Sequence, residues 1–149
     1  MPAPYTGGCQ CGAVRYEISA EPVAAYVCHC TECQRQSGSA FAMAIRVPNE
    51  HFRLTRGALK SFVRTAPSGR TMECSFCPDC GTRIYHVPEH FKDQKSVKPG
   101  TLDDARWVKP THHLFVRSAL PWVRIPDGVV AQETMDPDTR WLRGQERES

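Results

Sequence analysis

Residues 71–87 read TMECSFCPDCGTRIYHV, and this stretch decides the fold. Residues 71–76 predict a strand that leads into a tight knuckle, CPDCG, and the apolar residues Ile84 and Val87 follow it. Two cysteines separated by two residues, with Gly81 directly after them, are typical of a turn that binds a metal ion. The stretch therefore indicates a β-rich protein in which a metal holds at least one turn.

Short strand patterns bounded by turn residues recur outside this stretch. The segment 12–20 alternates Val14, Tyr16 and Ile18 with polar neighbours, and further strands are expected at 40–48, 51–57 and 59–65. In the segment 31–39, Thr31 can cap a short helical turn that Gly38 would end. Twelve prolines and ten glycines favour many turns over a helix bundle. The predicted fold class is all-β, with roughly seven to ten short strands.

Length and charge limit the kinds of function. The 149 residues correspond to one domain, which we place at 5–135, followed by a polar tail at 136–149. We expect this tail to lie at the surface, although it contains Trp141 and Leu142. The net charge of +3 is spread along the chain, so neither a nucleic acid nor an anionic membrane is an expected partner. The first ten residues lack the pattern of a signal peptide and the apolar runs are too short to span a membrane, so we expect a cytoplasmic protein.

The eight cysteines are the most informative residues. In a reducing compartment, closely spaced cysteine pairs indicate metal ligands rather than disulfides. Two such pairs, Cys9-x-Cys11 and Cys77-x-x-Cys80, supply the four thiolates that a tetrahedral structural zinc site requires. The alternatives are that the two pairs hold different ions, or none.

A third group lies in CHCTECQ, residues 28–34. Three ligands, Cys28, Cys30 and Cys33, with a fourth position open, are the pattern of a catalytic zinc site, whereas four protein ligands are the pattern of a structural one. Cys74 is the remaining thiol, and it is either a fourth ligand here or a small buried apolar residue. We expect His29 to point outward, because both of its neighbours point at the metal.

These motifs together resemble the glutathione-dependent formaldehyde-activating enzyme family, which centromere protein V-type domains share. The resemblance rests on GGCQCGAVRY, CHCTECQRQSGSAFA, FCPDCGTRI and PGTLDD, and covers about residues 7–128. It implies several short, coiled antiparallel sheets stapled by two zinc ions per chain. It implies a structural zinc on Cys9, Cys11, Cys77 and Cys80, and a second zinc with an exchangeable fourth position on Cys28, Cys30 and Cys33. Cys74 is not part of the pattern.

The activity that the resemblance implies is that of a carbon–sulfur lyase. Such an enzyme joins a small-molecule thiol, glutathione, to an aldehyde, formaldehyde, or catalyses the reverse reaction. The alternatives are a non-catalytic zinc-stabilised binding module, or a detoxifying enzyme with another thiol or electrophile. Arg35 or Arg46 could bind the carboxylates of the thiol, although for each we expect a solvated surface side chain. A turn explains Asp103 and Asp104 without catalysis.

Overall fold

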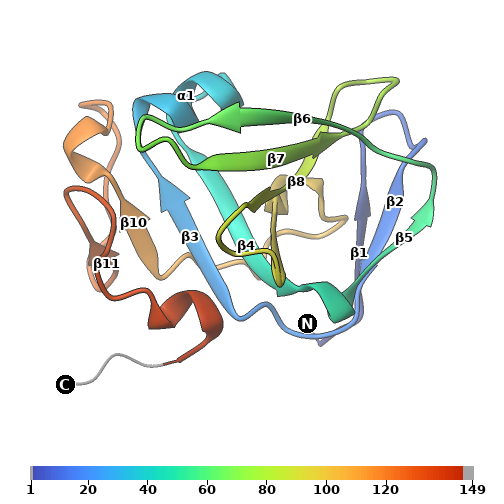
Figure 1. Ribbon diagram of the computed structural model, residues 1–149. Helices are drawn as coiled ribbons and strands as arrows, with labels where there is room; N and C mark the ends of the chain where they lie inside the picture. The colour runs from blue at the N-terminus through green and yellow to red at the C-terminus, as the bar shows by residue number, and fades with distance from the viewer. Residues whose placement is uncertain (1, 146–149) are drawn as a thin grey trace. The chain divides into compact units, whose positions relative to one another are not determined.

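The structure is a computed structural model that describes residues 2–145, and it confirms the all-β fold class. Eleven strands and one α-helix occur in the described range, slightly more strands than expected. The strands are β1 (Tyr5–Gly8), β2 (Arg15–Ile18), β3 (Ala24–Cys28), β4 (Ala42–Pro48), β5 (Phe52–Arg56), β6 (Lys60–Thr65), β7 (Thr71–Phe76), β8 (Arg83–Pro88), β9 (Gln94–Val97), β10 (His112–Leu114) and β11 (Val130–Ala131) (Figure 1).

The helical elements are short. The α-helix is α1 (Thr31–Ser37), and the 3-10 helices are η1 (Asn49–His51), η2 (Pro99–Thr101), η3 (Val116–Ser118) and η4 (Arg140–Arg143). No helix in residues 2–145 is both long enough and apolar enough to cross a membrane. The chain forms two compact units: unit 1 comprises Met1–Pro22 and Ile45–Val108, and unit 2 comprises Val23–Ala44 and Lys109–Ser149.

Unit 1 contains two antiparallel sets of strands. β2 pairs with β1 on one side and with β5 on the other, and the strands β4, β9, β8, β7 and β6 pair in that order. The alternation predicted for residues 12–20 is confirmed, because Val14, Tyr16 and Ile18 are all buried. Ile84, from the opening stretch, is also buried, so the β7–β8 hairpin is anchored in the core at the point where it leaves the knuckle.

Unit 2 is built on parallel strands. β10 pairs in parallel with β3 and with β11, whereas the resemblance implied antiparallel sheets. The helix α1 follows β3 after two residues and ends at Gly38, which adopts the predicted left-handed conformation with φ of 61°. The N-cap is Cys30 rather than Thr31.

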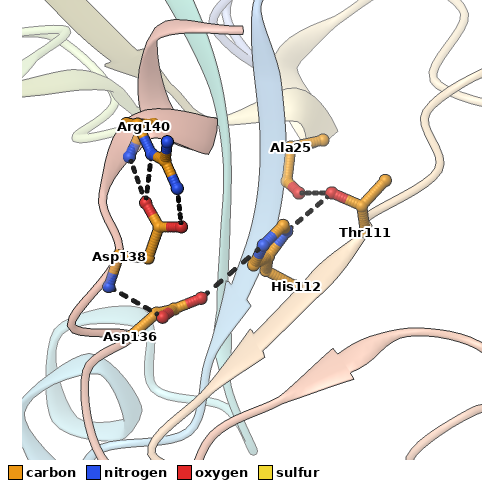
Figure 2. A network of polar contacts seen from close by, with 6 residues as sticks. All are labelled: Ala25, Thr111, His112, Asp136, Asp138 and Arg140. Atoms are coloured by element: carbon orange, nitrogen blue, oxygen red, sulfur yellow. Dashed lines mark hydrogen bonds and ion pairs between the residues drawn. The ribbon is translucent and has the colours of Figure 1, made fainter. Parts of the chain in front are cut away.

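The C-terminal segment of unit 2 is not a surface tail. Asp136, Trp141 and Leu142 are buried, so the expectation that this segment lies at the surface is wrong for them. The indole of Trp141 stacks on the imidazole of His112 with ring centroids 3.8 Å apart. Figure 2 shows Asp136 facing His112, whose Nδ1 is hydrogen-bonded to the Thr111 hydroxyl at 2.8 Å. Residues 146–149 of the predicted tail lie outside the described residues.

Candidate metal centres

Two similar turns in unit 1 bring four cysteines together, and we call Cys9, Cys11, Cys77 and Cys80 the four-cysteine cluster. The first turn joins β1 to β2, and its Gly12 N–H donates to the Cys9 carbonyl. The second joins β7 to β8, and its Gly81 N–H donates to the Cys77 carbonyl. Both glycines have φ near +80° (83° and 80°), a conformation that other residues rarely adopt, and this explains the glycine after each pair.

The sulfur positions fit one tetrahedral ion. All four Sγ atoms lie within 4.8 Å of one another, and the Sγ atom of Cys11 is 3.6 Å from that of Cys9 and 3.8 Å from that of Cys77. A tetrahedron with zinc–sulfur bonds of about 2.3 Å has edges of about 3.8 Å. The thiols predicted to chelate one ion are therefore spaced as that ion requires.

Hydrogen bonds around the four-cysteine cluster favour thiolates. The Val14 N–H donates to the Sγ of Cys9 at 3.2 Å, and the Asp79 N–H donates to that of Cys77 at 3.4 Å. The Thr82 hydroxyl lies 3.2 Å from the Sγ of Cys80 and lowers the pKa of that thiol to about 5. Donors that stabilise the ionised sulfurs support the binding of a cation.

The second group lies in unit 2, and we call Cys28, Cys30 and Cys33 the three-cysteine cluster. Cys28 ends β3, Cys30 caps α1, and Cys33 lies in the first turn of α1, where its N–H donates to the Sγ of Cys30 at 3.3 Å. The three Sγ atoms lie within 4.8 Å of one another. The described residues of unit 2 add no fourth cysteine, histidine or carboxylate to the group.

Charge in the three-cysteine cluster also favours a cation. Hydrogen bonds from Cys28 and Cys33 lower the pKa of Cys30 to about 2, and the hydrogen bonds with Cys30 and Cys33 raise the pKa of Cys28. The thiols of this cluster therefore oppose one another's ionisation. A divalent ion allows all three to ionise together, which is the usual coupling of metal binding to proton release.

His29 corrects the expectation that it points outward. Its side chain is fully buried in unit 2, where Nε2 lies 2.9 Å from Nδ1 of His113 and the ring meets Phe41 edge-on at 5.4 Å. The backbone N–H of His29 donates to the Leu114 carbonyl at 2.9 Å, which extends the pairing of β3 with β10 beyond Cys28. His29 therefore anchors the loop that carries the cysteines on either side of it.

Gln34 is a residue that the sequence analysis did not select. Its side-chain amide donates to the carbonyls of His29 at 2.8 Å and of Ser118 at 2.9 Å. It thus ties the start of α1 to the segment after β10. Its position in the sequence could have indicated this role, because Gln34 directly follows Cys33 and lies four residues after Cys30, the N-cap of α1.

The sequence analysis also considered three other residues: Cys74, Arg46 and Arg35. Cys74 is completely buried in β7 and belongs to neither cluster. Arg46 is buried, with Nε donating to the Gln94 side chain and its guanidinium 4.4 Å from the centroid of the Phe91 ring, so the expectation that it is a solvated surface side chain is wrong. Arg35 is exposed beside an open hollow of about 410 Å³ on α1.

The aspartate pair also has a structural explanation. Asp103 accepts hydrogen bonds from Arg15 and Thr6, and Asp104 accepts from Arg106, so each is paired with its own arginine. The Arg15 guanidinium and the Thr6 hydroxyl hold the pKa of Asp103 below its usual value. Both carboxylates are therefore held by contacts with side chains of unit 1.

Comparison with known proteins identifies the family. The family model described as "glutathione-dependent formaldehyde-activating enzyme" matches residues 4–118, most of the chain. The chain belongs to the glutathione-dependent formaldehyde-activating enzyme family. The resemblance stated from the cysteine motifs is thereby confirmed.

Known members of this family are distant relatives. A Penicillium rubens protein that carries the family name is 27% identical over 124 residues, which are 78% of this chain and 64% of the relative. A Talaromyces marneffei protein with the same family name is 22% identical over 126 residues, 81% of this chain and 66% of the relative. The chain thus spans less than two thirds of the length of either of these relatives. A Rhodobacter sphaeroides protein of known crystal structure matches with a TM-score of 0.52 and 27% identity, over 70% of this chain and 91% of that one.

Proposed function

We propose that the protein is a zinc-dependent carbon–sulfur lyase that acts on the adduct of a thiol and an aldehyde, such as S-hydroxymethylglutathione. The observation that carries the proposal is the contrast between the two clusters. Unit 1 brings four thiols to one point, the number that closes a structural site, and unit 2 brings three. The family name, which refers to glutathione and formaldehyde, supports the choice of substrates.

We assign one zinc ion to each cluster, two per chain. Ligation by thiolates alone favours zinc over magnesium, calcium or manganese, which prefer oxygen ligands. At the three-cysteine cluster, zinc supplies a Lewis acid that lowers the pKa of an incoming thiol. The same ion at the four-cysteine cluster has a structural role, because the protein fills all four of its positions.

The chain's own residues position this chemistry. Cys28 comes from a strand, and Cys30 and Cys33 come from the first turn of α1, so their sulfurs are held by two elements. The side chain of Gln34 and the buried His29 fix the loop between these elements. Cys28 is buried, whereas Cys30 and Cys33 are each partly exposed, which leaves a path for a thiol to approach.

The reaction needs no oxidant or reductant. In the forward direction the sulfur lone pair of the thiol forms a bond to the aldehyde carbon. The π electrons of the carbonyl move to its oxygen, which gains the proton that the thiol loses. The reverse reaction breaks the carbon–sulfur bond and returns the proton to sulfur. An ionised sulfur held in a fixed direction accelerates the addition, because ionisation and orientation are both achieved beforehand.

We further propose that the protein works in the cytoplasm. All eight cysteines are free thiols in the structure. A reducing compartment preserves free thiols, and seven of them belong to the two clusters.

Zinc X-ray absorption on protein with a counted metal content tests the proposal. We expect two zinc ions per chain whose two shells together contain the seven cysteine sulfurs and one light-atom ligand. Added glutathione should replace this light atom with sulfur. Two sites with four sulfurs each, unchanged by glutathione, would overturn the enzyme proposal in favour of a non-catalytic binding module.

A kinetic test uses exchange between formaldehyde and S-hydroxymethylglutathione, followed by NMR with the uncatalysed rate subtracted. Cys33→Ser should lose one zinc ion and most of the catalysed exchange. Cys74→Ala is the matched control, because it removes a thiol that lies in neither cluster. Equal catalysed exchange in wild type and Cys33→Ser would contradict the assignment of the reaction to the three-cysteine cluster.

A further inference from the structure

The open hollow on α1 is a polar site with one positive charge. It has a volume of about 410 Å³ and is lined by Thr31, Gln34, Arg35, Gly38 and Ser39. All five residues belong to unit 2, so a single compact unit forms the hollow. The lining contains no aspartate or glutamate, and Gly38 adds no side chain to it. The charge of the lining therefore favours a ligand that carries a negative group.

The hollow adjoins the three-cysteine cluster along α1. Thr31 directly follows Cys30 in the chain, and Gln34 directly follows Cys33. Gln34 is also four positions after Cys30, a spacing that places two side chains next to each other on a helix. Arg35 lies five positions after Cys30, which corresponds to about 7.5 Å along the helix axis. A molecule that reaches the sulfurs of the cluster can therefore extend to Arg35.

The donors of the hollow are not used by the rest of the protein. Among residues 2–145, no carboxylate forms an ion pair with the guanidinium of Arg35, and the hydroxyls of Thr31 and Ser39 have no hydrogen-bond partner. An arginine guanidinium can bind a carboxylate through two parallel hydrogen bonds, and a hydroxyl can donate one more. The hollow thus combines a cation with available donors that match a carboxylate.

One wall of the hollow is held in place by Gln34. Its side-chain amide donates to the carbonyls of His29 and Ser118 at 2.8 and 2.9 Å. The Gln34 carbonyl accepts a hydrogen bond from the backbone N–H of Ser39 at 3.2 Å, which fixes the residue at the other end of the lining. A site whose walls are already ordered loses less conformational entropy when a ligand binds.

We propose that the hollow on α1 binds a carboxylate of the thiol substrate, and that Arg35 selects thiols that carry this group. The proposal depends on the function proposed above, because it takes the sulfur of the substrate to lie at the three-cysteine cluster. In an extended peptide, the carboxylate of a residue that follows cysteine lies roughly 7 Å from the cysteine sulfur. This distance is similar to the separation of Cys30 and Arg35 along α1. The substrate class is therefore a short peptide thiol with a carboxylate rather than an uncharged thiol.

Isothermal titration of the zinc-loaded full chain with two forms of one thiol tests the site. Glutathione carries free carboxylates, and its diethyl ester has the same thiol with the carboxylates capped. We expect wild type to bind glutathione about fivefold more tightly than the ester, the gain from one solvent-exposed pair of charges. Arg35→Gln should bind the two forms with affinities within about twofold of each other and should retain its zinc.

Arg124→Gln is the matched control. Arg124 is another exposed arginine of unit 2, and it does not line the hollow, so its variant should keep the wild-type preference for glutathione. Four results would overturn the proposal: no binding of either form at millimolar concentration, equal binding of both forms by wild type, a preference that persists in Arg35→Gln, or a preference that Arg124→Gln loses equally.

An NMR titration adds a readout that does not depend on the affinity of a variant. In the ¹⁵N spectrum of wild type, the guanidinium Nε–H signal that is missing from Arg35→Gln should shift when glutathione is added to saturation. The diethyl ester should leave it in place. An Arg35 signal that glutathione does not shift contradicts the site.

Kinetics separate this inference from the proposed function. We expect Arg35→Gln to raise the KM for glutathione about fivefold in the exchange with formaldehyde and to leave kcat unchanged. If only the inference fails, wild type catalyses the exchange and Arg35→Gln does so with the same KM. If the proposed function fails, wild type catalyses no exchange, and a preference for glutathione that Arg35→Gln removes still supports the hollow as a carboxylate site.

Discussion

Replacement of Cys11 by serine tests the four-cysteine cluster most directly, because Cys11 is an exposed thiol. If no metal bound there, the substitution would alter only the surface, where changes in stability are usually within about 0.5 kcal/mol. If zinc bound there, the substitution would remove a ligand from the link that joins the first turn of unit 1 to the β7–β8 turn. The two interpretations therefore predict very different results for one oxygen-for-sulfur exchange.

The expected magnitude follows from the length of chain that the link closes. Cys11 and Cys77 are 66 positions apart, and a cross-link that closes a loop of this length stabilises a fold by about 4 kcal/mol in the chain-entropy treatment. Loss of such a link from a chain of this size lowers Tm by roughly 10 °C or more. We therefore expect Cys11→Ser to contain one zinc ion fewer and to melt at least this much earlier.

The assay combines a zinc count with thermal and urea unfolding, followed by tryptophan fluorescence. Trp107, stacked on Tyr5 at 4.1 Å, reports on unit 1. Cys74→Ala is the control: it removes a fully buried thiol from β7 and should keep both zinc ions. If Cys11→Ser kept two zinc ions and melted within about 2 °C of wild type, the assignment of Cys11 as a zinc ligand would be wrong.

Three more predictions concern single side chains. Gln34→Ala leaves two carbonyls without their donors and should lower the free energy of unfolding by about 2 kcal/mol in urea titrations; no measurable change would mean that the bridge is not stabilising. Because the folded-state pKa of His86 is depressed, its contribution to stability is complete above the unfolded value near 6.5 and declines as pH falls below it. Between pH 6.5 and 5, the free energy of unfolding should therefore fall less steeply in His86→Gln than in wild type, by up to about 1.4 kcal/mol per pH unit, and identical slopes would contradict the depressed pKa. Trp141→Ala removes the ring stacked on His112 and should cost about 3–5 kcal/mol, whereas Trp122→Ala, at a residue 73% exposed, should cost less than about 0.5 kcal/mol; similar losses would refute the packing assigned to the C-terminal segment.

The local parts of the structure were predictable because their causes are local. A tight turn is specified within five residues, Cys77–Gly81, since the two thiols are spaced to reach one ion and the glycine takes the backbone conformation that the turn requires. Alternation of apolar and polar residues likewise predicted β2, and Gly38 predicted the end of α1. The grouping of two distant cysteine pairs was predictable for another reason: four thiolates satisfy one zinc ion, and each pair alone does not.

The incorrect expectations depended on partners far away in the sequence. His29 was expected to face solvent because its neighbours Cys28 and Cys30 were expected to face a metal. The side chain that buries it, His113, lies 84 positions later. Trp141 was placed at the surface because its neighbours are polar, and the ring that covers it belongs to His112. Parallel pairing leaves no turn signal between its strands, so no local pattern indicated that β3 and β10 are adjacent.

The discontinuity of unit 2 has a consequence for the order in which the protein matures. During synthesis on the ribosome, CHCTECQ emerges early, but β10, which pairs in parallel with β3, is translated only about 80 residues later. Until then the segment that carries the three thiols lacks its pairing with β10. The inserted segment, Ile45–Val108, by contrast, completes the four-cysteine cluster as soon as Cys80 is made. The four-cysteine cluster can therefore form on the nascent chain, whereas the three-cysteine cluster gains the pairing of β3 with β10 only after β10 has been made.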